Sequence, residues 1–271
     1  MNAELAQIIT LVAHGNLFLR SGKTTAADLS SNPAFQYVSA VKFARYQNKQ
    51  EAQGKEAAGS VSEWFAFLRL AGVTRLWQIA FQWERKDIPE HVAAGFAGGV
   101  PNAIQADLPN GFELWYPKWE TGGPKEKPWS VEYRALMFPY SHAVPPVDLD
   151  LVKIRLGMAI AQALEFSSKQ PAMENGYWIP RFTEALALLN STNLITSFPA
   201  EILPESGYCL EARQILAAAA QAYVFGGMGS WNDMGFSDPA LEKEYERIST
   251  ELYEAIKMGT TLATNSFALE I

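Results

Sequence analysis

RLWQIAFQWE, residues 75–84, alternates apolar and polar side chains and is the clearest strand signal in the chain. Trp77, Ile79, Phe81 and Trp83 fall on one side of such a strand, because successive side chains point to opposite faces of a sheet. Antiparallel sheets often bury one face and solvate the other. We therefore expect the Trp-rich face in the core, while an open aromatic face that binds a peptide or sugar would have the same pattern.

Further strands are expected on both sides of this stretch. Asn110-Gly111 lies between two extended runs, and both residues tolerate the positive φ of a tight hairpin turn. Strands are predicted near 103–107 and 112–118 and in the segments that begin at Phe35 and Trp129. The segment 48–59 has no apolar period and is expected to be an exposed loop. The first half is thus predicted to hold an antiparallel sheet of about five strands with flanking helices.

Helical periodicity dominates the chain after the proline-rich segment 139–150. The expected helices cover 148–168, 176–189, 207–224 and 238–264, and in the last of them Asp238 is placed to cap and Pro239 to fill the first turn. The predicted fold class is α+β with a mainly helical second half. We expect one compact unit over 1–271, with a possible sub-division into a sheet-rich region, 1–146, and a helical region, 147–271, because the later helices could cover an apolar sheet face.

Charge is distributed unevenly along the chain, whose formal net charge is −7. Residues 1–146 contain 14 basic and 13 acidic residues, whereas residues 147–271 contain 8 basic and 16 acidic residues. An acidic half repels phosphate backbones, so nucleic-acid binding is disfavoured. A basic protein partner is compatible with this charge.

Several classes of protein are disfavoured by composition and spacing. No run reaches the roughly 18 apolar residues of a membrane span, and the first residues lack the basic start and cleavage site of a secretory signal. The single cysteine, Cys209, excludes an internal disulfide framework, and the three histidines share no metal-ligand spacing. We therefore expect a cytoplasmic protein with no membrane contact, no metal and no cofactor.

AYVFGGMGSWNDMGF, residues 222–236, contains residue types used in phosphate and acyl chemistry. A phosphate-binding glycine loop precedes a helix, whose free amides face the anion, but this segment follows one. Gly226 and Gly227 lie where a helix end favours left-handed backbone. We interpret the segment as a structural corner in which Trp231 fills a helix junction while Asn232 and Asp233 bond local backbone. The alternative is a recognition loop with Ser230, Trp231, Asn232 and Asp233 as binding residues.

FGGMGSWNDM, residues 225–234, resembles a Gly-Gly-Met-Gly-Ser-x-Asn-Asp motif of uncharacterised bacterial proteins, some of which are similar to immunity-type proteins encoded near toxins. The resemblance is limited to this C-terminal segment and leaves the sheet-rich half unassigned. It implies no particular activity. It points to a bacterial protein that binds another protein.

DIPEHV gathers Asp87, Glu90 and His91 directly after the strongest strand. Loops at strand ends often carry chemistry, so His91 is the best candidate for a general base. A surface histidine beside solvated carboxylates would have the same sequence. The sequence therefore predicts a non-catalytic, immunity-like binding protein, with a metal-independent hydrolase that uses a site near residues 84–91 as the alternative.

Overall fold

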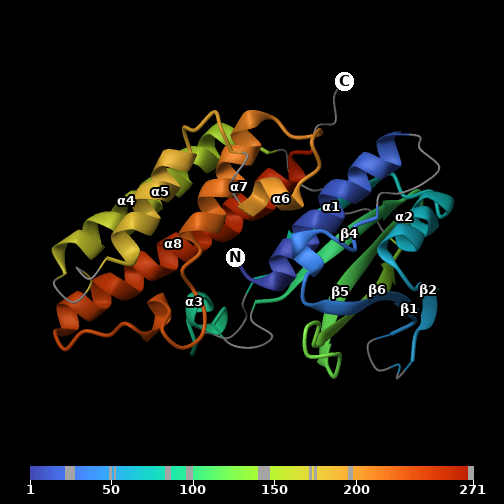
Figure 1. Cartoon of the computed structure of the whole chain (residues 1–271), viewed down its shortest axis with the longest axis horizontal. Coiled ribbons are helices and arrows are strands. Elements are labelled where there is room, and N and C mark those ends of the chain that lie inside the picture. The colour runs from blue at the N-terminus through green and yellow to red at the C-terminus, as the bar shows by residue number, and fades with distance from the viewer. Residues whose placement is uncertain are drawn as a thin grey trace.

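The computed structural model describes the chain except residues 22–27, 49–50, 52, 83–86, 96–99, 140–146, 171–172, 174–175, 195–197 and 268–271. The fold is α+β, as predicted. A sheet with the helices α1 (Ala3–Ser21) and α2 (Val61–Leu70) lies at one end of the molecule, and the helices of the second half lie at the other (Figure 1).

The described strands form one mixed sheet in the order β2-β1-β6-β5-β4-β3. Its strands are β1 (Val38–Tyr46), β2 (Lys55–Ala58), β3 (Arg75–Ala80), β4 (Asn102–Leu108), β5 (Gly111–Thr121) and β6 (Trp129–Phe138). β1 runs parallel to β6, and every other pair is antiparallel. The prediction of about five antiparallel strands is therefore only partly right. Periodicity indicates which residues share a face, but not which distant strand lies alongside.

Two local predictions in the sheet region need adjustment. β2 forms inside 48–59, the segment predicted to be an exposed loop. The β4–β5 hairpin is confirmed, but Leu108 pairs with Gly111, so the two loop residues are Pro109 and Asn110. Gly111 begins β5 with a φ of 145°, and a Cβ there would lie 2.1 Å from the carbonyl oxygen of Phe138. Glycine is needed at this position because the neighbouring backbone leaves no room for a side chain.

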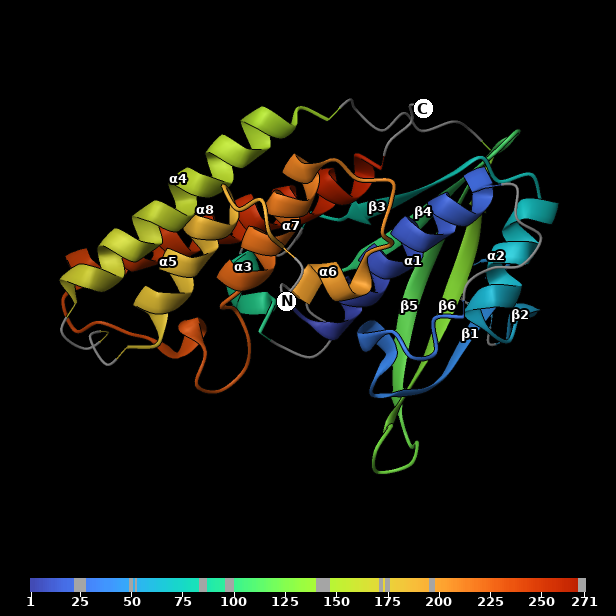
Figure 2. The same ribbon diagram turned by 45° about the horizontal axis from the view of Figure 1, so that its top comes forward.

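The predicted buried face of β3 is wrong. The structure buries Leu76 and Gln78, while Trp77 and Ile79 lie half-buried on the opposite face; Trp83 lies outside the described residues. The helices α1 and α2 pack on the Leu76 side, where Trp64 of α2 already fills the core. Its ring lies 4.4 Å from that of Phe43, measured between centroids. Figure 2 shows both helices on the same face of the sheet.

Two asparagine side chains cover the free edge of β3. Asn16 of α1 accepts from the backbone N–H of Leu76 at 2.8 Å and donates to its carbonyl at 2.9 Å. Asn265 makes the same pair of bonds with Gln78, at 2.7 and 2.8 Å. An edge strand otherwise presents unpaired backbone groups that promote aggregation. The two amides satisfy these groups as a neighbouring strand would.

The helices predicted in the second half are confirmed to within three residues at each end. They are α4 (Leu149–Lys169), α5 (Trp178–Leu188), α7 (Leu210–Ala222) and α8 (Pro239–Asn265), with the short α6 (Phe198–Ile202) in addition. Asp238 caps α8 by accepting from the backbone N–H of Ala240 at 2.9 Å. Among the described residues, no helix combines the length and apolarity that are needed to cross a bilayer.

Candidate functional site

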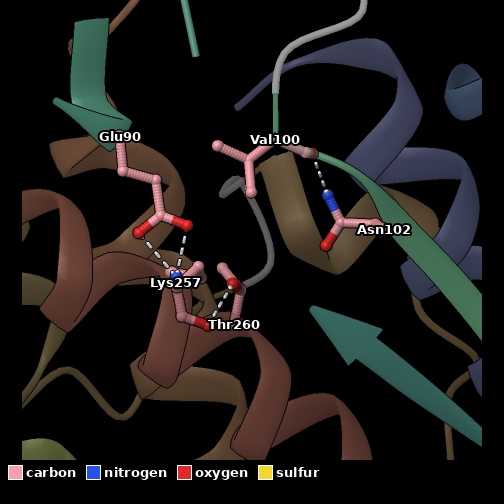
Figure 3. Close-up of polar contacts among 5 residues, drawn as sticks. All are labelled: Glu90, Val100, Asn102, Lys257 and Thr260. Carbon is pink, nitrogen blue, oxygen red and sulfur yellow. Dashed lines mark hydrogen bonds and ion pairs between the residues drawn. The ribbon is translucent and has the colours of Figure 1, made fainter. Parts of the chain in front are cut away.

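The short helix α3 (Glu90–Ala93) directs the predicted hydrolase residues to different neighbours. Both carboxylate oxygens of Glu90 accept from the Lys257 ammonium of α8, at 2.6 and 2.7 Å (Figure 3). Asp87 lies exposed before the helix, and residues 84–86 of the predicted site lie outside the described part of the chain. The Glu90 carboxylate is therefore occupied by an ion pair and does not orient His91.

His91 is buried, with 3% of its surface exposed. Its Nδ1 lies 3.4 Å from Oδ1 of Asn232, and Nδ2 of Asn232 donates to the His91 carbonyl at 3.0 Å. Burial lowers the pKa of His91, and the contact with Asn232 and the charge of Glu246 oppose this shift only in part. The imidazole is therefore favoured in its neutral form. Its Nε2 atom has no hydrogen-bond partner among the described residues.

This environment suits a structural histidine better than a general base. A general base must reach the proton that it abstracts, and it is usually oriented by a carboxylate or a similar group. His91 instead joins α3 to residues 226–236, which we call the glycine corner, across 141 positions of sequence. The structure thus brings together His91 and Asn232, two candidate residues from separate predicted sites, and leaves Asp87 and Glu90 outside that contact.

The glycine corner is a tightly bonded turn that follows α7. Gly229, with a φ of 82°, is its left-handed residue, whereas neither Gly226 nor Gly227 has a positive φ. The Ser230 hydroxyl donates to the Gly226 carbonyl at 2.9 Å, and the Gly229 amide donates to the Asp233 carboxylate. Met228 stands fully exposed at the tip. Ser230 and Asp233 therefore act on the corner itself, whereas Asn232 bonds to His91 of α3.

Trp231 fills the junction between the second-half helices. It is fully buried, and its ring meets those of Trp178 and Phe182 edge to face, each at 5.4 Å between centroids. Its Nε1 donates to the Ser249 hydroxyl of α8 at 2.7 Å. A ligand at the surface has no access to this ring. Of the four predicted residues, only Asp233 is exposed, and Ser230 and Asn232 are half-buried.

A groove between α4 and α8 is a second candidate site, apart from His91 and the glycine corner. Sequence reasoning missed it. Its volume is about 650 Å³. α4 contributes Arg155, Met158, Ala159 and Gln162; α8 contributes Glu251, Glu254, Ala255, Lys257 and Met258; Gln82 and Glu90 complete the lining. The buried Oε1 of Gln162 has no hydrogen-bond partner among the described residues. The groove is open and lies between two helices, a setting in which peptide segments are bound.

An exposed apolar stripe runs along α4 toward this groove. Leu151, Ile154 and Met158 expose 53, 59 and 59% of their surface. Their spacing of three and four residues places them on one side of the helix. The buried side of α4 carries Val152, Leu156 and Ile160. The sequence signal for this surface is the second apolar side of α4. A helix that packs against the core on one side needs apolar residues on that side only.

The stripe begins at an acidic end. Asp148, Asp150 and Glu211 lie around an open hollow at the start of α4, and Glu251 and Glu254 lie in the groove at its other end. Arg155 and Lys257 are the basic residues of the groove lining. Lys257 is paired with Glu90, and Glu251 is paired with Arg247 of the same helix at 2.8 Å. The arrangement offers apolar contact area with carboxylates at both ends.

A second, much smaller cavity lies near the Glu90–Lys257 pair. It has a volume of about 20 Å³. Its lining combines apolar residues with the polar residues Asn2, Asn102, Tyr223, Tyr253, Lys257 and Thr260. Figure 3 shows two of its residues bonded locally, Asn102 to the Val100 carbonyl and Thr260 to the Lys257 carbonyl. A cavity of this size holds about one water molecule. It is too small for an organic substrate.

Comparison of the chain with protein-family models, with curated proteins and with solved structures found no match. Within the described ranges, no group of three or more histidine, cysteine, aspartate or glutamate side chains is placed to hold a metal ion. The geometry of the groove and the stripe therefore carries the functional argument.

Proposed function

We propose that this protein is a non-catalytic binding protein that holds a basic segment of another protein on the α4–α8 surface. The observation that carries the proposal is the exposed stripe Leu151, Ile154 and Met158, which ends at carboxylates on both sides. Exposed apolar patches rimmed by polar residues commonly mark interaction surfaces.

The charge of the second half supports a basic partner. Residues 147–271 contain twice as many acidic as basic residues. Complementary potential accelerates encounter and rejects acidic competitors. Within the groove, the acceptor Gln162 Oε1 and the carboxylate of Glu254 are suited to Lys or Arg side chains, which carry only donors.

The partner would present apolar side chains at helical spacing to the stripe, with basic side chains beside them. Helix-in-groove recognition uses such anchors at i, i+3, i+4 and i+7. An immunity-type role, in which this chain neutralises a basic toxin, agrees with the resemblance of residues 225–234 and belongs to the same proposal. The hydrolase alternative receives no support from the arrangement around His91.

A display selection tests the proposal, because it needs no candidate partner at the outset. A peptide library random in charge is selected against the purified chain, and each enriched peptide is measured again on Ile154→Ser, on the double variant Glu251→Gln/Glu254→Gln, and on Leu70→Ser. Leu70 is the matched control because it is 89% exposed on α2, away from the groove. We expect basic, amphipathic peptides that bind the first two variants at least about tenfold more weakly. Peptides without a basic bias, or equal loss on Leu70→Ser, would reject the proposal.

A further inference from the structure

Most of the charged side chains that line the α4–α8 groove are already paired within the chain. The pairs are Glu90 with Lys257, at 2.6 Å, and Glu251 with Arg247, at 2.8 Å. Arg155 and Glu254 are the exceptions, since none of the residues whose placement the structure gives forms an ion pair with either. Both are exposed. The groove therefore offers one cation and one carboxylate to a ligand.

The directions of the two helices place these charges at different points along the groove. α4 and α8 run antiparallel, because Arg155 Nη1 lies 3.7 Å from Met258 Sδ, while the Phe166 ring, further along α4, lies 6.1 Å from that of Tyr245. Arg155 therefore lies at the Met258 end of the groove. Glu254 precedes Met258 by about one helical turn, or ~6 Å along the axis, and so lies toward the other end.

Gln162 marks that other end. It follows Arg155 by nearly two helical turns, so the two side chains share one side of α4 and are separated by ~10 Å along its axis. No donor of the described chain bonds to its buried Oε1 atom. A buried acceptor without a partner costs free energy, and a donor on a ligand would satisfy it. Glu254 and Gln162 thus form an acceptor region, and Arg155 is a donor at the opposite end.

The lining between the two ends is apolar. Met158 is 59% exposed and Met258 is half-buried, and Ala159 and Ala255 are buried beside them. Methionine side chains are unbranched and adapt to different apolar shapes. A ligand that spans the groove therefore meets a donor, an apolar surface and an acceptor region in that order.

We infer that the segment held in this groove is bipolar: it presents a carboxylate to Arg155, a Lys or Arg side chain to Glu254 and Gln162, and an apolar side chain between them. The inference rests on the proposed function and adds one acidic residue to the basic segment of the partner. In a helical partner, a separation of ~6–10 Å corresponds to positions four to seven residues apart. A carboxylate can accept two parallel hydrogen bonds from a guanidinium, whereas a wholly basic segment would bring a like charge to Arg155.

Two helical probe peptides test the inference by fluorescence anisotropy at low salt. Both carry a leucine stripe and an arginine; seven positions from the arginine, the bipolar probe has glutamate and the basic probe has glutamine. The wild type should bind the bipolar probe about three- to fivefold more tightly, the range of one exposed ion pair. Arg155→Gln should remove this preference. Lys243→Gln, which removes the same charge at an exposed position of α8 outside the groove, should keep it.

A charge exchange gives a second measurement. Arg155→Glu should prefer a third probe, with lysine in place of the glutamate, over the bipolar probe. A preference for the bipolar probe that survives Arg155→Gln would overturn the inference. Equal binding of the first two probes to the wild type, weakened by Ile154→Ser, would overturn it as well but leave the proposed function standing. Binding of no probe would overturn both.

Discussion

Asn16 and Asn265 are the residues on which the edge of the sheet depends, since each satisfies one N–H and one C=O of β3. Leucine at position 265 would leave both backbone groups of Gln78 buried without a partner. Each such loss costs about 1–3 kcal/mol, so we expect Asn265→Leu to lower the free energy of unfolding by about 3 kcal/mol. Urea denaturation measures the change. The control Asn190→Leu, at an exposed position after α5, should change the free energy of unfolding by less than about 0.5 kcal/mol.

Gly229 holds the glycine corner in a left-handed conformation, and a Cβ there would meet nothing within 4 Å. The cost of Gly229→Ala is therefore conformational and not steric. We expect the variant to lose about 1–2 kcal/mol of stability in a thermal or urea unfolding experiment. Gly235→Ala is the matched control, because Gly235 is equally unobstructed but has no positive φ. Equal effects at both positions would contradict the role given to Gly229.

At the scale of elements, α4 differs from a simple packed helix because it carries two apolar sides. Ile160 is fully buried and Ile154 is 59% exposed. We expect Ile160→Ser to lower the free energy of unfolding by several kcal/mol, because it removes buried apolar volume and adds a polar group to the core. Ile154→Ser should change it by less than about 0.5 kcal/mol. A large loss at Ile154 would mean that the stripe is used for folding and not for binding.

The elements that the sequence predicts best are those with local signals. The ends of α8 follow from Asp238 and Pro239, whose capping chemistry needs only the adjacent backbone. The predicted buried face of β3 is wrong, because the alternation of residues 75–82 does not reveal which side the helices take. Asn16 interrupts the apolar stripe of α1 in the sequence. Its side chain bonds to the backbone of Leu76, 60 positions away, and no local pattern predicts that contact.

The candidate site is less predictable than the fold. The contact of His91 with Asn232 joins two segments that share no sequence pattern. The expectation that Trp231 fills a helix junction is confirmed, because a large aromatic side chain between helices usually packs into their junction. The α4–α8 groove depends on how two helices cross, and the sequence contains that information only in the second apolar side of α4. Spacing within one helix is therefore readable, whereas the relation between helices is not.

For the whole molecule, the pH dependence of stability contains a contribution from Glu4. Burial raises the pKa of Glu4 to about 7, against the lesser, opposing effect of hydrogen bonds from Asn102. The folded state therefore binds the proton of the Glu4 carboxyl more tightly than the unfolded state, in which the pKa of Glu4 is 4.5. Stability from this group is present below pH 4.5 and is lost as pH rises to about 7.

Glu4→Gln removes this ionisation. We expect the variant to gain up to about 3 kcal/mol over the wild type at about pH 8 and to gain little below the unfolded-state pKa. Urea denaturation at the two pH values measures the difference between variant and wild type, which separates Glu4 from other titrating groups. Glu244→Gln, an exposed glutamate on α8, should give the same difference at both pH values. A gain that ignores pH would contradict this account of Glu4.

Under the proposed function, the carboxylates around the α4 stripe draw a basic partner to the chain. The salt dependence of the dissociation constant of a selected peptide tests it most directly, in the wild type, in Glu251→Gln/Glu254→Gln, and in the control Glu201→Gln/Glu205→Gln, which removes the same charge outside the groove. We expect weaker binding as salt rises, with a shallower dependence in the groove variant than in the control. Binding that ignores salt, or identical slopes in the two double variants, would contradict it.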